Sequence, residues 1–471
     1  MTSKIFKIIL FLILLSSQIH PQSLSDMIDA ALEDSLFSVS QISINVYDLT
    51  AKESLYRKNE ELLLRPASNL KLFTTAAALY YLVDDINFTT PFFIEGELID
   101  SVLNGNLYVK GGFDPLFSVN DFDSVVNQLK SIGIKNITGN FFYDVSNIDS
   151  LYFGKGWMWD DNSYSFMPYL SSLCINKNSV KVYFEPGKIG DPALVELNPI
   201  SDYYSVTNNL LTTIEDTSSI KIERDWLGNN NHIILSGDIS YSKQLDSTSI
   251  NIINPPEFFA NLFLNKLAEN GIVLEGEILS KPVPSITDTL MTVKRNMMDV
   301  ITETNRESDN LSAEMLLRKI SYENSNGSAS AKKGLRYIDS LIVELGFKPK
   351  TFVFADGSGL SHYNLINTEL VLDLLKYIYY NEPEIYGKIF ETLPTAGIDG
   401  TLKYRMKFGN AYKNVNAKTG TISGVSSLSG YLTAANNHLI AFSIFIQNYS
   451  GSAKKARQIQ DNICNILVNY K

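Results

Sequence analysis

The sequence predicts a mixed α/β (α+β) fold in which an antiparallel sheet is flanked by helices and carries a long insertion. Residues 41–47 alternate between apolar and polar side chains, and a second strand is expected at 54–57. Three more strand-like segments lie at the far end of the chain, at 416–422, 426–434 and 439–447. Helical spacing at 25–37 and 453–468 flanks these two groups. We therefore expect strands from both ends of the chain to form one sheet between the terminal helices.

The first 22 residues have the order of segments found in secretory signals. Lys4 and Lys7 precede the apolar run 8–15, which small and polar residues follow at 16–18. The run is too short to span a bilayer comfortably, so residues 1–22 are expected to form a signal peptide. No cysteine lies near the expected cleavage position, and no later apolar run reaches transmembrane length. We expect a periplasmic protein without a lipid anchor or a transmembrane segment.

Composition indicates a folded chain with more than one domain. Hydrophobic residues make up 45% of the 471 residues and charged residues 19%, so global disorder is excluded. The net charge of −11 argues against nucleic acid as a partner. Cys174 and Cys464 are compatible with a disulfide or with two buried thiols.

The middle of the chain changes pattern twice. Residues 68–82 have the composition of a buried helix. Between 92 and 239 short strand-like runs alternate with turns, and a helix is expected at 255–270. Apolar residues with helical spacing then return at 297–320, 334–345 and 368–380. The strand-rich part of this middle region is expected to be the insertion.

The chemistry is expected to start at Ser68 and Lys71. Side chains three residues apart lie on one helix face, so the Ser68 hydroxyl and the Lys71 amine can meet. A lysine whose pKa is lowered by burial can take the proton of a serine and make it a nucleophile. The same spacing recurs in more polar surroundings at Ser218, Ser240, Ser330 and Ser452. Ser68 differs from these because it opens an apolar helix.

Two further runs lie far downstream. Ser308 is expected to relay a proton to a leaving group and Asn310 to hold a substrate backbone, while Ser308 or Asp309 caps the helix that follows. The charge of Lys418 and the hydroxyls of Thr419 and Thr421 suit a free carboxylate, and Gly420 permits close approach of substrate. Ser-x-x-Lys, Ser-x-Asn and Lys-Thr-Gly in this order are typical of serine acyl-transferases of the penicillin-binding and β-lactamase type.

Other routes to catalysis are poorly supported. A Ser-His-Asp triad through His232, His362 or His438 stays formally open, but no Gly-x-Ser-x-Gly or His-Glu-x-x-His run is present. No metal site and no cofactor are implied.

Further runs extend the resemblance over nearly all of the mature chain. They are 112–116, 356–361, 393–402 and 417–432. With the three motifs, they resemble the D-alanyl-D-alanine carboxypeptidases and endopeptidases of the penicillin-binding protein 4 type, the peptidase S13 family. That family inserts extra domains between the first two motifs, whereas β-lactamases have far shorter spacing there.

The resemblance implies a serine β-lactamase/transpeptidase-like catalytic domain and a hydrolase of peptidoglycan stem peptides. Ser68 would attack the D-Ala carbonyl, Lys71 would take its proton, and Ser308 with Lys418 would protonate the leaving D-Ala. The backbone N–H groups of Ser68 and Thr421 would form the oxyanion hole. β-Lactam antibiotics would acylate the same serine, and the resulting acyl-enzyme would hydrolyse slowly.

Two features of this chain bear on substrate preference. Asp161 resembles the acidic residue that meets a diaminopimelate-type amine in the family. His362 stands where the family often has an arginine after the Gly-Leu-Ser run.

The resemblance also implies a domain division. It assigns 23–90 and 286–471 to the catalytic domain, 91–150 and 240–285 to a second domain, and 151–239 to a third domain inserted in the second.

Three alternatives stay open at this point. They are a catalytically weak penicillin-binding or cell-wall scaffold protein, a β-lactamase with rapid antibiotic turnover, and a membrane-surface role for the helix at 453–468.

Overall fold

The computed structural model describes residues 23–82, 86–161, 163–325 and 328–471. The expected signal peptide, 1–22, lies outside the described residues. A five-stranded antiparallel sheet has the order β16-β17-β18-β1-β2. Its strands are β1 (Gln41–Asp48), β2 (Glu53–Lys58), β16 (Asn416–Ile422), β17 (Val425–Thr433) and β18 (Leu439–Gln447). The first and last strands of the chain pair along their whole length, from Gln41 opposite Gln447 to Asp48 opposite Ile440. The predicted sheet is confirmed.

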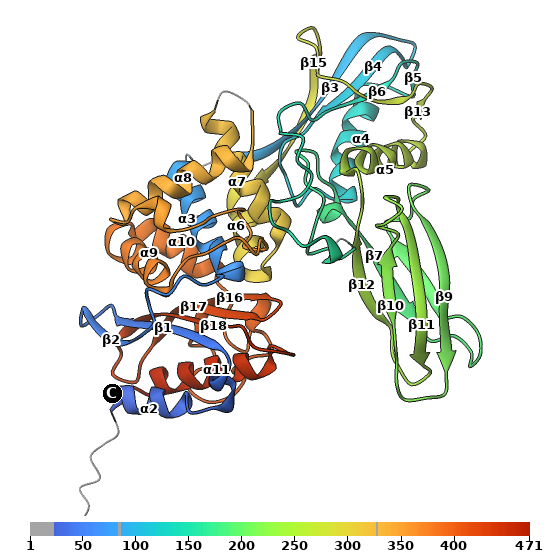
Figure 1. Ribbon diagram of the computed structural model, residues 1–471. Coiled ribbons are helices and arrows are strands. Elements are labelled where there is room, and N and C mark those ends of the chain that lie inside the picture. The colour runs from blue at the N-terminus through green and yellow to red at the C-terminus, as the bar shows by residue number, and fades with distance from the viewer. Residues whose placement is uncertain (1–22, 83–85, 162, 326–327) are drawn as a thin grey trace, which may run out of the picture.

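The terminal helices α2 (Leu24–Ala31) and α11 (Lys454–Val468) cover one face of this sheet (Figure 1). Ile28 of α2 and Ile463 of α11 are buried with Ile44 of β1, because each helix presents one apolar stripe to the strands. The apolar face of α11 is therefore occupied by the core, which removes the argument for a membrane-surface helix. No described helix combines the length and apolar character that a bilayer crossing requires.

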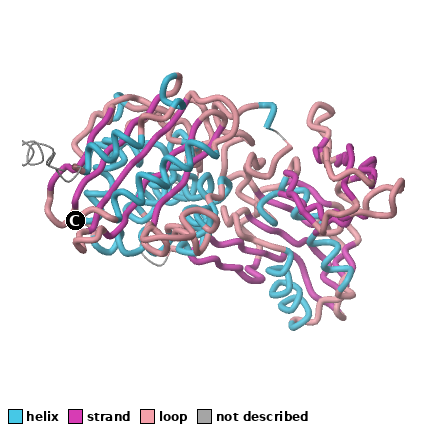
Figure 2. Tube along the Cα trace, turned by 90° about the horizontal axis from the view of Figure 1, so that it is seen from below, coloured by secondary structure: helices cyan, strands magenta, loops and turns pink. Residues whose placement is uncertain are grey.

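A larger group of helices covers the opposite face (Figure 1). Figure 2 shows the strands of the sheet from below, running side by side and overlapping the helices. The helices are α3 (Lys71–Tyr81), α6 (Met297–Thr302), α7 (Asn310–Asn324), α8 (Ala331–Glu344), α9 (Thr368–Asn381) and α10 (Pro383–Thr392). Phe73 of α3 and Leu316 of α7 are fully buried with Phe445 of β18. Cys174 belongs to this core and Cys464 to the one beneath the sheet, and both are free thiols.

The inserted region has its own sheets. The long strands β3 (Asn87–Ile99), β4 (Val102–Lys110) and β15 (Asp288–Asn296) form a seven-stranded sheet with β5 (Asn136–Ile137), β6 (Phe141–Asp144), β13 (Val273–Leu274) and β14 (Ile278–Ser280). Two helices, α4 (Phe122–Ser131) and α5 (Pro255–Glu269), bury an aromatic core against it.

Two three-stranded sheets complete the insert. One has the order β12 (Asp246–Asn251), β7 (Ser179–Glu185), β8 (Leu194–Asn198). The other has the order β10 (Lys221–Arg224), β11 (His232–Ser240), β9 (Ser205–Thr213).

The helix predicted over 297–320 is interrupted in the structure. After α6 the chain makes a π-helical turn at Glu303–Glu307, and Ser308 then adopts a left-handed conformation with φ 63°. Helix α7 restarts because the Asp309 carboxylate accepts a hydrogen bond from the Ser312 N–H. The helix predicted over 25–37 likewise ends at Ala31, and Asp34 caps a separate 3-10 turn at Ser35–Ser38. In both cases an acidic residue caps a new turn or helix inside the segment for which the apolar spacing predicts one continuous helix.

Candidate active site

Ser68 lies in a 3-10 turn, η2 (Ala67–Leu70), that leads directly into α3. The Lys71 Nζ is 2.9 Å from the Ser68 Oγ, as the spacing of the two residues predicts. Ala67, immediately before the serine, has φ 47°, a conformation that side chains rarely adopt. This turn directs the Ser68 side chain out of the helix and into the cavity.

The Lys71 ammonium has a second and a third partner. It donates to the Asn310 Oδ1 at 2.6 Å and to the Ser358 carbonyl oxygen at 2.6 Å. Lys71 is fully buried. Burial lowers its pKa to about 8, although the carboxylates of Asp356, Asp309 and Glu314 oppose the shift by favouring the charged form. A lysine with this pKa is neutral often enough near pH 8 to accept a proton from a serine.

Lys418 and Ser308 form a second hydrogen-bonded pair beside the first. The Lys418 Nζ donates to the Ser308 Oγ at 2.7 Å. Burial, and then the neighbouring charge of Lys71, lowers the pKa of Lys418 well below its ordinary value. The left-handed backbone at Ser308 breaks the helix so that its hydroxyl meets β16, since a regular helix would point it elsewhere.

Gly420 lets β16 pack directly on the turn that holds the serine. A Cβ at this position would lie 2.8 Å from the Ser68 backbone nitrogen and 2.9 Å from the Pro66 oxygen. The contact is fixed on both sides, because Asn69 Nδ2 donates to the Lys418 carbonyl oxygen and Ser427 Oγ donates to the Pro66 carbonyl oxygen. The two backbone N–H groups predicted for the oxyanion hole, those of Ser68 and Thr421, therefore belong to segments that meet here.

A buried acidic network supports Lys71 from behind, and sequence reasoning did not single it out. Glu314 accepts hydrogen bonds from the backbone N–H groups of Gly357 and Ser358, at 2.9 and 3.0 Å, and pairs with the buried Arg318 at 2.8 Å. It thereby fixes the carbonyl of Ser358 that contacts Lys71. One signal was available: Glu314 follows Asn310 by four residues, which places both on one face of α7.

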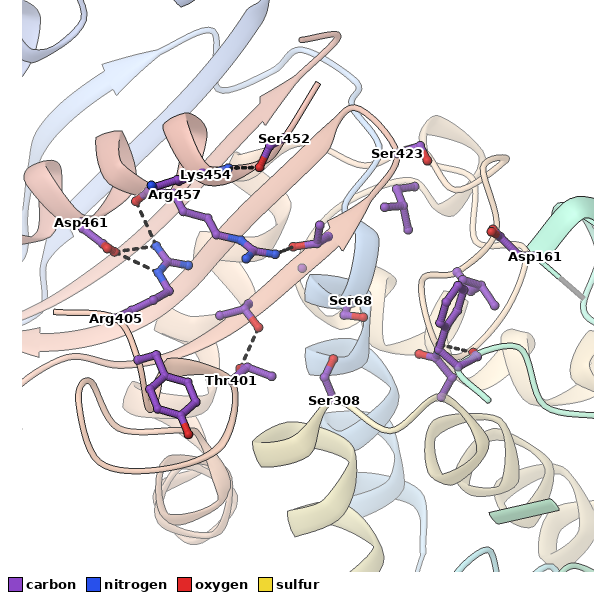
Figure 3. Close-up of a pocket in the computed structure, with 18 of the residues that line it drawn as sticks. Ser68, Asp161, Ser308, Thr401, Arg405, Ser423, Ser452, Lys454, Arg457 and Asp461 are labelled. Atoms are coloured by element: carbon purple, nitrogen blue, oxygen red, sulfur yellow. Dashed lines mark hydrogen bonds and ion pairs between the residues drawn. The ribbon is translucent and has the colours of Figure 1, made fainter. Parts of the chain in front are cut away.

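Asp161 lines the cavity that Ser68 faces, on the side of Ser68 away from Thr401 (Figure 3). It ends a short 3-10 turn, Trp159–Asp161. Burial, and then the adjacent Asp160, raises its pKa. His362 also lines the cavity, and its Nδ1 is 3.5 Å from the Arg65 guanidinium.

The cavity is large enough for a peptide. It has a volume of about 770 Å³, within the range of sites for drug-sized ligands. Ser68, Ser308, Asn310, Thr419, Gly420, Thr421 and Asp161 all line it. Asn310 donates its Nδ2 to the Phe166 carbonyl oxygen, so this side chain joins Lys71 to the Asp161 side of the cavity.

The described histidines do not form the Ser-His-Asp triad that the sequence left open. His438 bonds to Asp48 at 2.7 Å, and His232 bonds to the hydroxyls of Ser205 and Thr207. Among the histidines that the structure describes, none is hydrogen-bonded to both a serine and a carboxylate.

Comparison with known proteins identifies the family. The model of the D-Ala-D-Ala carboxypeptidase 3 (S13) family matches residues 24–470. The chain belongs to this family.

Relatives of known name match nearly all of the chain. The chain is 30% identical to a D-alanyl-D-alanine carboxypeptidase of Actinomadura sp. (strain R39), over 95% of this chain and 85% of that protein. It is 28% identical to the D-alanyl-D-alanine carboxypeptidase DacB of Haemophilus influenzae, over 94% of this chain and 99% of that protein. The crystal structure of penicillin-binding protein 4 (dacB) from Haemophilus influenzae superimposes with a TM-score of 0.83 at 25% identity, and covers 94% of this chain and 99% of that one. The predicted fold class and the family resemblance are confirmed.

Proposed function

We propose that this S13 family member is a serine-type D-Ala-D-Ala carboxypeptidase that hydrolyses peptidoglycan stem peptides through an acyl-enzyme on Ser68. The observation that carries the proposal is the placement of two serine–lysine pairs, Ser68 with Lys71 and Ser308 with Lys418, around one cavity. The names of the family and of the relatives agree with it. We also propose that the protein acts in the periplasm.

Acylation begins at Lys71. In its neutral form, Lys71 takes the Ser68 proton across the 2.9 Å contact while the Ser68 Oγ attacks the D-Ala carbonyl carbon. The carbonyl oxygen gains negative charge, which the N–H groups of Ser68 and Thr421 stabilise by hydrogen bonding. Hydrogen bonds from Lys71 to Asn310 and Ser358 hold the amine in place for this transfer.

Release of the terminal D-Ala needs a proton on its nitrogen. Ser308 donates its hydroxyl proton to that nitrogen and recovers one from Lys418, 2.7 Å away. Water then attacks the acyl-enzyme by the reverse of these steps, which restores the Ser68 hydroxyl and frees the shortened peptide.

The same serine is proposed to react with β-lactams. A second structure of the Haemophilus influenzae penicillin-binding protein 4 is described as a complex with a β-lactam. In a β-lactam the leaving nitrogen stays tethered to the acyl group, so it remains in the site and hinders the attacking water.

Asp161 is proposed to bind an amine of the stem peptide on the acyl side of Ser68. Endopeptidase activity on cross-linked stems is a second candidate, favoured by one observation. The cavity continues past Thr421 to α11, which leaves room for a leaving group larger than alanine.

The test is release of D-alanine from a stem pentapeptide ending in D-Ala-D-Ala. The wild-type protein is expected to release it and Ser68→Ala to lose release almost completely. Ser218→Ala is the matched control, because Ser218 has the same spacing to a lysine but lies on the insert. Equal activity of the wild type and Ser68→Ala would contradict the proposal, and so would the absence of release by the wild type.

A further inference from the structure

The cavity ends in a group of charged side chains that the chemistry at Ser68 does not use. Beyond β16 it is lined by Arg405, Lys454, Arg457 and Asp461. Figure 3 shows these residues on one side of Ser68 and Asp161 on the other. The cavity is therefore basic at one end and acidic at the opposite end.

Arg405 is already neutralised within this group. Its guanidinium donates twice to the Asp461 Oδ1, at 2.6 and 3.0 Å, and once to the Gln460 Oε1 at 3.1 Å. Arg405 and Asp461 therefore form a closed ion pair that braces the wall of the cavity.

Arg457 differs, because it forms no close ion pair, although its charge acts on Asp461 one helical turn away. Its Nη2 donates to the Thr421 hydroxyl at 3.2 Å. Among the described residues, no carboxylate oxygen lies within 4.0 Å of its guanidinium. Its neighbour Lys455, by contrast, pairs with Asp34 at 2.6 Å.

The position of Arg457 on α11 is also unfavourable for stability. Lys454, Lys455 and Arg457 all stand in the first turn or just after it, and that turn contains no acidic residue. The helix dipole makes this end positive, so cations there destabilise the helix. Because Arg457 lines the cavity and makes no close ion pair, its guanidinium is available to an anion bound there.

Thr421 fixes where that anion would lie. Side chains two residues apart on a strand share a face, so the hydroxyls of Thr419 and Thr421 lie on the same side of β16. The leaving residue of the proposed reaction carries a carboxylate one carbon away from the scissile nitrogen. The two hydroxyls and the Arg457 guanidinium line the cavity beside the Thr421 N–H, so they are the donors available to this carboxylate.

We propose that Arg457 binds the carboxylate of the leaving D-residue together with Thr419 and Thr421, and that it selects substrates in which this carboxylate is free. The proposal rests on the proposed carboxypeptidase function and names a specificity residue for it. Asp161 at the acidic end and Arg457 at the basic end then orient a zwitterionic peptide across Ser68.

The experiment compares two substrates that differ only at the group Arg457 would bind. One is the stem pentapeptide ending in D-Ala-D-Ala, and the other is the same peptide with a C-terminal carboxamide. Mass spectrometry follows the tetrapeptide product, which is common to both. For Arg457→Ala we expect kcat/KM to fall about 10- to 100-fold on the carboxylate peptide, the range for one charge-assisted hydrogen-bonded contact, and to change less than about 3-fold on the carboxamide.

Two variants and one stability measurement complete the design. Arg457→Lys is expected to keep more activity on the carboxylate peptide than Arg457→Ala, because it keeps the charge. Lys455→Ala, on the same helix turn but paired with Asp34, is the matched control and should match the wild type. The melting temperature of Arg457→Ala should not fall.

Equal losses on both peptides would overturn the proposal, since Arg457 would then act only by holding Thr421. No loss on either peptide would overturn it as well. A wild-type protein that cleaves neither peptide contradicts the proposed function itself, and the assignment of Arg457 falls with it.

Discussion

Acylation of Ser68 should follow the titration of Lys71, because only the neutral amine can take the serine proton. The pKa of Lys71 is lowered from 10.5 to about 8 by burial. At pH 7 about one molecule in ten then has a neutral Lys71, and at pH 9 about nine in ten, so the rate should rise roughly tenfold and level off. With an unshifted pKa of 10.5, the rise over the same interval would be about 100-fold and would continue beyond pH 9.

The assay is the second-order rate constant for penicillin acylation between pH 6 and 10, measured by the growth of the covalent adduct. The same profile measured for Asp309→Asn is a second test. The Asp309 carboxylate raises the Lys71 pKa, so its removal should move the inflection to lower pH, while asparagine still caps α7. A flat profile between pH 7 and 9 would refute the assignment of Lys71 as the base, and a rise that continues past pH 9 would refute its lowered pKa.

Three further substitutions and one matched control have defined outcomes. Ser308→Ala should lower kcat/KM for the pentapeptide by roughly 10²- to 10⁴-fold, since it removes the proposed proton donor, and an undiminished rate would exclude that role. Glu314→Gln should lower the free energy of unfolding by about 3–5 kcal/mol in urea titrations, because it leaves the buried Arg318 unpaired. Glu323, which pairs with Lys319 on the same helix, is itself one third exposed, so Glu323→Gln should cost less than about 1 kcal/mol, and equal costs would contradict the reasoning. Asp161→Asn should weaken cleavage of stems with a side-chain amine about tenfold and leave penicillin acylation unchanged, whereas an equal effect on both reactions would remove the proposed amine contact.

The sheet could be predicted because its strands carry period-two patterns and its helices carry apolar stripes, which are local signals. The π-helical turn before Ser308 has no such signal. It depends on the contact of Ser308 with Lys418 on a strand 110 residues away. Helix α10 was not predicted, because the polar residues 381–384 end the helical pattern of α9 and the new helix begins among them at Pro383.

The candidate site likewise contains residues that the sequence predicts and residues that it does not. Ser68, Lys71, Ser308 and Lys418 stand in short motifs, and the structure brings all four together. Arg457 and Glu314 belong to no motif. Each is an ordinary charged residue of a helix in the sequence, and only the fold shows that the first reaches Thr421 and the second reaches the loop behind Lys71.

The central claim is that Ser68 carries the acyl group. The most direct test is intact-mass analysis of the protein after incubation with penicillin, followed by peptide mapping of the adduct, with Ser68→Ala and Ser218→Ala in parallel. We predict a single penicilloyl adduct on Ser68 in the wild type and in Ser218→Ala, and none in Ser68→Ala. An adduct that persists in Ser68→Ala, or that maps to another residue, would contradict the account.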